Sequence, residues 1–243
     1  MSRSPGASAA SIAELPGGPF LDVILPALNE KSSVAPAIQS AADPAVRELV
    51  LVDGGSLDAT RDIAAAAGAR VLSSQPGRAR QMNEGAFTTA GEVLLFLHAD
   101  TVLPENFATQ IRESLQDTRV AWGRFDVRLS GEDSRLRLVE FLMNWRSRLT
   151  GISTGDQAIF VRRSVFMEIR GFREMPLMED VDLSIRLRRE GKCAALRSRV
   201  VTSSRRWESN GVFRTILLMW ALRLGYAIGV SPGRLAAIYA RGR

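Results

Sequence analysis

The chain has 243 residues, of which 46% are hydrophobic, so it can bury a full core and is not a disordered protein. Its formal net charge of +6 is carried almost entirely by arginines spread among many acids, with no aromatic and basic recognition motif, so nucleic acid is not an expected partner. Cys193 is the single cysteine, which excludes an internal disulfide and a cysteine-rich zinc site.

The N-terminal segment, 1–18, is rich in Ser, Ala, Gly and Pro and has no apolar core. We therefore predict a disordered tail rather than a signal peptide or a transmembrane anchor, and with it a cytoplasmic location. The rest of the chain is expected to form a main domain over 19–205 and a C-terminal helical extension over 206–243.

Strand and helix patterns alternate through the first half of the chain. In order, the expected elements are a strand over 20–25, a helix ending near 42, a strand over 48–52, a helix over 58–67, a strand over 69–72, a helix over 78–90 and a strand over 93–97. This alternation predicts βαβ units and a mostly parallel sheet. Right-handed crossovers then bring the strand ends to one edge, where ligands bind in such folds.

Acids follow three of these strands, namely Glu30, Asp53 and Asp100. An acid near a helix start can be an N-cap, which is our interpretation of Asp58, but three acids at one edge favour a ligand site. The turn Gly54-Gly55-Ser56 lets a ligand approach the backbone closely, although it is no Walker loop or dinucleotide fingerprint. Asp100 suits either a divalent cation or proton transfer.

The pattern is less regular after Pro104. It predicts strands over 122–129 and 158–161 and helices over 134–149 and 181–189. Glu179 and Asp180 precede the last of these helices, where the helix dipole alone favours acids. They also follow the apolar run 175–178, and a carboxylate beside an apolar wall can act as a base.

The segment 212–230 predicts a long apolar helix that contains Arg214 and Arg223. An arginine near mid-bilayer costs about 2.5–3.5 kcal/mol, so this helix is not expected to cross a membrane. Two alternatives are left. The helix packs on its own domain or on a second copy in a homodimer, or it makes a peripheral contact with an anionic membrane on the inner face. Its apolar character almost all round favours packing.

Four segments in this order resemble the motif set of family 2 glycosyltransferases. They are Pro26-Ala27-Leu28-Asn29-Glu30, Asp53-Gly54-Gly55-Ser56-Leu57-Asp58-Ala59-Thr60, Leu97-His98-Ala99-Asp100 and Glu179-Asp180. The resemblance covers about 20–187 and implies the α/β fold named GT-A, in which helices flank a Rossmann-like, mostly parallel sheet. The segments 77–86, 98–101 and 205–207 are further similar to a bacterial subgroup labelled as glycosyltransferases of arsenosugar biosynthesis.

The resemblance implies a role for each matching residue. Asp53 would accept a hydrogen bond from the nucleotide base, and Asp100 would hold a divalent cation, Mn²⁺ or Mg²⁺, on the diphosphate of the donor. Asp180 would be the catalytic base, with Glu179 beside it. The other residues implied in nucleotide-sugar binding are Pro26, Leu28, Glu30, Gly54, Arg78, Asn83, His98, Ala99, Arg206 and Trp207.

The implied activity is inverting, metal-assisted transfer of a sugar from a nucleotide-diphosphate sugar to an acceptor hydroxyl. A nucleotidyltransferase is one alternative, but 26–30 occupies the place of its glycine- and lysine-rich loop. A nucleotide-sugar binding protein without activity is another. His98 departs from the family, which has an acid there: it is either a partnered histidine at a strand end or a ligand for Mn²⁺ or Zn²⁺.

Overall fold

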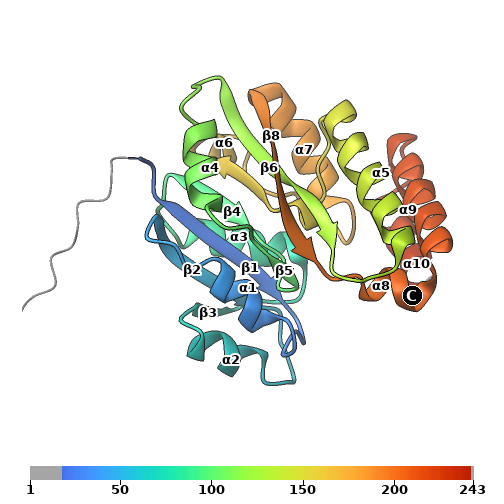
Figure 1. The fold of residues 1–243 in the computed structure, drawn as a ribbon, viewed down its shortest axis with the longest axis horizontal. Coiled ribbons are helices and arrows are strands. Elements are labelled where there is room, and N and C mark those ends of the chain that lie inside the picture. Colours follow the sequence, from blue (N-terminus) through green and yellow to red (C-terminus); the bar gives the residue numbers. More distant parts are fainter. Residues whose placement is uncertain (1–17, 242–243) are drawn as a thin grey trace, which may run out of the picture.

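A computed structural model describes residues 18–241 and shows a mixed sheet of eight strands in the order β3-β2-β1-β4-β7-β6-β8-β5 (Figure 1). The tail expected over 1–18 lies outside the described residues except for Gly18. One half of the sheet is parallel throughout and consists of β1 (Leu21–Ala27), β2 (Val46–Asp53), β3 (Arg70–Ser73) and β4 (Val93–Phe96). The α/β architecture with a mostly parallel sheet is thus confirmed.

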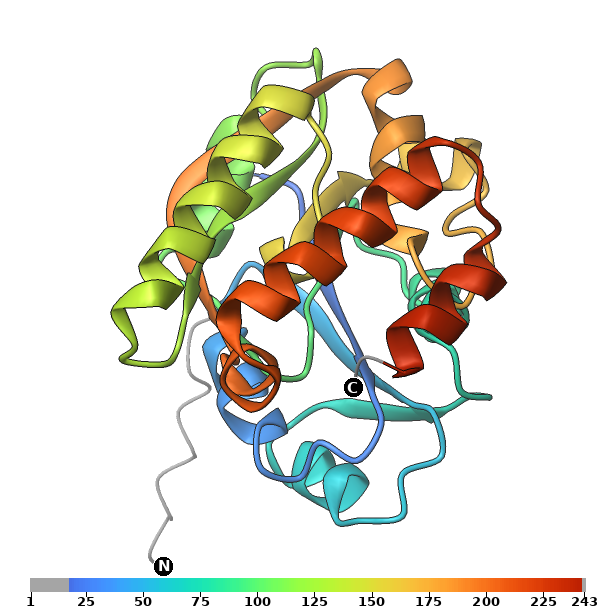
Figure 2. The ribbon, with the colours of Figure 1, turned by 90° about the vertical axis from the view of Figure 1, so that its right-hand side faces the viewer.

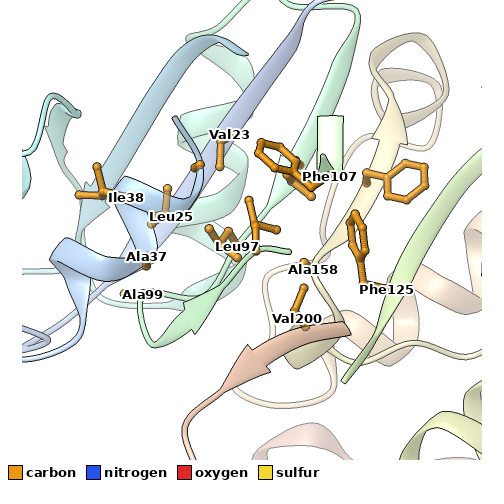
Figure 3. Close-up of a cluster of buried hydrophobic side chains, with 14 of the residues drawn as sticks. Val23, Leu25, Ala37, Ile38, Leu97, Ala99, Phe107, Phe125, Ala158 and Val200 are labelled. Atoms are coloured by element: carbon orange, nitrogen blue, oxygen red, sulfur yellow. The ribbon is translucent and has the colours of Figure 1, made fainter. Parts of the chain in front are cut away.

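Successive side chains of the parallel strands point to opposite faces of the sheet, and both faces are covered. Val23 and Leu25 belong to one hydrophobic cluster, and Ile24 between them belongs to a second. This double burial explains why the strands are apolar without alternation. Figure 3 shows part of the first cluster, where Leu97 lies between residues of β1 and Phe107.

Helices from different parts of the chain supply the two clusters. The first contains residues of α1 (Val34–Ser40), α2 (Thr60–Ala66), α4 (Phe107–Ser114) and α5 (Ser134–Thr150). The second contains residues of α3 (Arg78–Phe87), α6 (Arg163–Glu168) and α7 (Glu179–Glu190).

The second half of the sheet is mixed and was only partly expected. It consists of β5 (Thr101–Val102), β6 (Val120–Leu129), β7 (Ile159–Arg162) and β8 (Lys192–Thr202). The strand β8 was not predicted, because most of its residues are only partly buried and its sequence is rich in arginine. It pairs in parallel with β6 and antiparallel with β5. This pairing brings the residues after Thr202 next to the end of β4.

The C-terminal segment folds back on itself rather than forming one long helix. The helix expected over 212–230 ends earlier, as α9 (Val212–Ala227), because Gly229 has a positive φ of 90° and Pro232 then starts α10 (Pro232–Arg241). Figure 2 shows α10 returning beside α9, which crosses near α5. The expected boundary at 205/206 falls at the start of α8 (Arg205–Asn210). Within residues 18–241, no helix is long and apolar enough to cross a membrane.

Helix α3 packs closely on the sheet at Gly85, and this contact gives a stability prediction. A Cβ at Gly85 would lie 2.6 Å from Ile24 Cγ2 and 3.0 Å from Val52 Cγ2. We expect Gly85→Ala to lower the free energy of unfolding by about 1–3 kcal/mol in urea titrations, since overpacking forces the helix off the sheet. The matched change Gly233→Ala, where a Cβ meets nothing within 4 Å, should stay within about 0.5 kcal/mol of wild type. Equal effects of the two changes would contradict this account.

Candidate active site

The ends of β1 and β4, the start of α7 and the C-terminal helices line one cavity of about 830 Å³. Parallel strand ends meet at one sheet edge, and the turn after β4 is closed by a hydrogen bond from Thr101 N to His98 O. Most of the site residues predicted from the sequence line this cavity. They are Pro26, Leu28, Glu30, Arg78, His98, Ala99, Asp100, Glu179, Asp180, Arg206 and Trp207.

Asp53 and Gly54 shape the wall of the cavity instead of lining it. Asp53 is 1% exposed, and its carboxylate accepts hydrogen bonds from the amides of Gly55 and Ser56 and from the Ser56 hydroxyl. In this conformation the carboxylate holds the turn after β2. A Cβ at Gly54 would come within 3.2 Å of Gln81 atoms, so the glycine lets that side chain pack against the turn.

Asn83, which the resemblance implies in nucleotide-sugar binding, is not among the residues that line the cavity. Its side chain donates to Phe172 O and accepts from Phe172 N, both at 2.8 Å, and so ties α3 to the loop after α6. Gln81 lines the cavity in its place, although it was not predicted to be a site residue. Its Nε2 donates to Ala27 O and Val52 O, joining the ends of β1 and β2. Gln81 follows Arg78 by three residues on a helix, and this spacing places the two side chains on the same side of it. That spacing was the signal from which Gln81 could have been predicted.

Asp100 faces Glu30 across the guanidinium of Arg205. Arg205 Nη2 lies 3.0 Å from Glu30 Oε2 and 3.8 Å from Asp100 Oδ2. Burial raises the pKa of Asp100, and although the charge of His98 opposes this, the negative charges of Asp156 and Glu30 add to it. The two carboxylates thus need positive charge between them, which Arg205 supplies here. Arg205 belongs to the segment 205–207, but the resemblance implied no role for it.

The partner of His98 in the cavity is the carboxylate of Asp156. Its Nδ1 lies 3.3 Å from Asp156 Oδ1, and a Cβ at Gly155 would fall 2.2 Å from its Nε2, so the glycine leaves room for the ring. Burial acts to raise the pKa of Asp156, but the hydrogen bond and charge of His98, with Arg78, lower it to about 2. This pairing supports the interpretation of His98 as a partnered histidine at a strand end.

Glu179 and Asp180 lie in the first turn of α7, which follows Met178 in a left-handed conformation with φ of 73°. Asp180 Oδ2 accepts a hydrogen bond of 2.8 Å from Gly155 N, and its Oδ1 accepts one from Val181 N. Burial raises the pKa of Glu179, and the neighbouring charge of Asp180 raises it further. The main chain therefore orients Asp180, while Glu179 holds a proton more readily than a free glutamate does.

The described residues give a divalent cation few ligands of their own. No group of three or more His, Cys, Asp or Glu side chains that could hold a metal occurs within residues 18–241. Asp100 offers carboxylate oxygens, whereas His98 already faces Asp156. A hard cation here would need oxygens from phosphate or water, which is how Mg²⁺ usually binds with nucleotides. The donor set therefore fits a cation that arrives with a diphosphate.

Comparison with known proteins gives a family match and more distant relatives. The family model described as Glycosyl transferase family 2 matches residues 22–173. Glucosyl-3-phosphoglycerate synthase of Mycobacterium tuberculosis H37Rv is 31% identical over 112 residues, which cover 41% of this chain and 35% of that protein. The enzyme of the same name from Mycolicibacterium smegmatis is 32% identical over 113 residues, covering 42% and 37%. The matched region spans little more than a third of these curated relatives.

Solved structures share the fold. The Mycobacterium tuberculosis glucosyl-3-phosphoglycerate synthase in complex with Mn²⁺, UDP and glucosyl-3-phosphoglycerate has a TM-score of 0.57 at 24% identity, covering 75% of this chain and 71% of that one. Its complex with Mn²⁺ and UDP-glucose has a TM-score of 0.56 at 22% identity, covering 75% and 70%. At this identity the likeness is one of fold, and it agrees with the GT-A architecture expected from the sequence.

Proposed function

Because this chain belongs to glycosyl transferase family 2, we propose that it moves a sugar from a nucleotide-diphosphate sugar to an acceptor hydroxyl and inverts the anomeric configuration. The observation that carries the proposal is that one cavity is lined by both Asp100 and Asp180. A cation-binding acid and a base are the two groups that a single displacement at a sugar carbon requires.

The residues of the cavity have separate roles in this proposal. The donor diphosphate binds at Asp100 with Mn²⁺ or Mg²⁺, as solved relatives hold these ions together with UDP. When bound, the cation neutralises negative charge that develops on the leaving diphosphate. Arg78 and Arg206 line the cavity and add positive charge there. Asp180 accepts the proton of the acceptor hydroxyl, which then attacks the sugar carbon on the face opposite the diphosphate.

Release of nucleoside diphosphate from nucleotide sugars tests the proposal. UDP-glucose is the first donor to try, because it is bound in a solved relative, followed by GDP- and dTDP-sugars, each with Mn²⁺. Slow release of the diphosphate without acceptor, and faster release with one, is expected. Binding without release would favour the inactive nucleotide-sugar binding protein, and release of pyrophosphate would favour a nucleotidyltransferase.

The finer resemblance to the arsenosugar-biosynthesis subgroup also belongs to this proposal. It rests on 77–86, 98–101 and 205–207, and the structure brings Gly77, His98 and Arg205 to the same cavity. The relatives found by comparison carry another name, glucosyl-3-phosphoglycerate synthase. Transfer assays with phosphoglycerate and with hydroxyl compounds related to arsenosugars as acceptors will assign the subgroup.

We propose further that the protein is cytoplasmic and binds the inner face of the membrane through what we call the outer apolar face. This face consists of exposed side chains on the neighbouring helices α5 and α9, namely Leu138, Phe141, Trp145, Leu149, Phe213, Leu217 and Leu224, and of Ile228 directly after α9. Besides Arg206 and Arg223, which line the cavity, the extension 206–243 contains four more arginines and a single acid, Glu208. This charge attracts anionic lipid, whereas a second copy would bring like charges together.

Sedimentation with vesicles tests the membrane contact. Wild type should sediment with phosphatidylglycerol vesicles at low salt, and the double change Leu217→Glu with Leu224→Glu should stay in solution. Leu57→Glu, at a residue that is 96% exposed outside this face, should sediment like wild type. A stable dimer in light scattering that the double change dissolves would assign the face to a homodimer instead.

A further inference from the structure

The roles proposed above for donor binding and proton transfer do not involve two arginines of the cavity. Arg146 projects from α5 and Arg223 from α9, and both line the cavity. Arg146 Nη1 donates to Ile152 O at 3.1 Å, whereas its Nε and Nη2 are buried and have no hydrogen-bond partner. Within residues 18–241, neither guanidinium makes an ion pair with a carboxylate.

Both guanidinium groups are poorly solvated and act on each other. Burial, together with the positive charge of Arg223, lowers the pKa of Arg146 to about 9. Burial also lowers the pKa of Arg223, against the opposing charges of Asp180 and Asp156. Like charges that have lost water without gaining a counter-ion are costly to keep, so a structural role alone does not account for them. An oxyanion would satisfy the unpartnered donors, and Arg is the side chain best shaped for it.

The two arginines have neighbouring carboxylates in common. The charges of Asp180 and Asp156 act on both Arg146 and Arg223, and that of Asp156 also acts on Asp100. The arginines therefore lie near the proposed base, where an acceptor must present its hydroxyl.

We infer that Arg146 and Arg223 bind an anionic group of the acceptor, a phosphate or a carboxylate, and thereby hold its hydroxyl beside Asp180. This inference rests on the proposed function, since it names the class of acceptor for that site. It adds a recognition element from helix α9, which lies outside the matched family region 22–173. A neutral sugar acceptor would leave both guanidinium groups unpaired.

Calorimetry on the full chain saturated with UDP and Mg²⁺ tests the inference. The probes are glycerol, which is neutral, glycerate, which carries a carboxylate, and glycerol 3-phosphate, which carries a phosphate. We expect at least one anionic probe to bind about tenfold or more tightly than glycerol, the size of one hydrogen bond to a charged group. The two anionic probes show whether the pair takes carboxylate or phosphate. Equal binding of all three, or none, overturns the inference, whereas failure of UDP to bind counts against the proposed function itself.

Variants then assign the preference to these arginines. Arg146→Gln and Arg223→Gln should each remove most of the preference for the anionic probe. The matched control Arg214→Gln changes an exposed arginine of the same helix and should keep it. Retention of the preference in both cavity variants overturns the inference. So does an equal loss of affinity for UDP, which would place the arginines on the donor diphosphate.

Thermal unfolding separates recognition from a structural role. Without ligand, Arg146→Gln and Arg223→Gln should melt at or above the temperature of wild type, because each removes a poorly solvated charge. Adding inorganic phosphate to the UDP–Mg²⁺ complex, against chloride of equal ionic strength, should raise the melting temperature of wild type and Arg214→Gln but not of the cavity variants. Variants that melt well below wild type would show that the arginines serve the fold, and would overturn the inference.

Discussion

Asp180→Asn is expected to reduce sugar transfer by about 10²–10⁴-fold, the range that a positioned general base contributes. Both carboxylate oxygens of Asp180 accept main-chain hydrogen bonds, from Gly155 and Val181, so the side chain is held in place before any acceptor binds. Asparagine has nearly the same size but cannot take a proton from the acceptor. Single-turnover kinetics with saturating donor measures the loss, and donor affinity by calorimetry should change little.

Asp182, two residues after Asp180, provides a matched control. Asp182 is also in the first turn of α7, where it pairs with Arg173 at 3.1 Å and Arg186 at 2.7 Å. Asp182→Asn should lower stability through the loss of these ion pairs while keeping transfer once the protein is folded. Near-normal turnover of Asp180→Asn would show that another group takes the proton, and Glu179 beside it would be the next to test.

Asp100→Asn is expected to weaken nucleoside diphosphate binding in the presence of Mn²⁺ by about 100-fold or more, the upper end of what loss of an outer-shell partner costs a metal site. In EDTA the variant and wild type should bind the nucleotide similarly, because the cation no longer links it to Asp100. Calorimetry with Mn²⁺ alone should show weak binding to wild type, since the described residues hold no cluster of metal ligands.

Asp58→Asn serves as the control for this prediction. Asp58 follows β2, and its carboxylate accepts hydrogen bonds from the amide of Thr60 at the start of α2 and from the amide of Lys31 in the turn before α1. Its variant should therefore keep cation-dependent binding. Tight binding of Mn²⁺ to the nucleotide-free wild type would contradict the assignment, because the protein alone would then supply a complete set of ligands.

The parallel half of the fold could be predicted because β1, β4 and the end of β2 are buried on both faces and each helix between the strands has an apolar side. The strand β8 could not, since it is partly exposed and its residues are held by neighbours distant in sequence. The end of α9 was missed for another reason. Apolar residues continue past Ala227, and the pattern of hydrophobicity outweighed the turn signal from Gly229 and Pro232.

The site was predictable where strand ends dictate it and unpredictable where side-chain direction decides. Sequence order places Glu30 and Asp100 at one edge, and the structure brings both to the cavity. Sequence order does not tell whether a polar side chain faces a ligand or the protein main chain, as Asp53 and Asn83 show. Arg146 and Arg223 meet only through the packing of α5 and α9, which no local pattern reveals.

Helix α9 has two faces with separate surroundings, because the period of 3.6 residues per turn places Arg223 in the cavity and Leu217 and Leu224 in solvent. Inserting or deleting one residue at the start of α9 would rotate both faces by about 100° and misplace them together. A chimera that takes 206–243 from a relative would likewise replace the cavity face and the exposed face of α9 at the same time. Evolution and protein engineering alike must therefore alter this helix by substitution in place rather than by changes in its length.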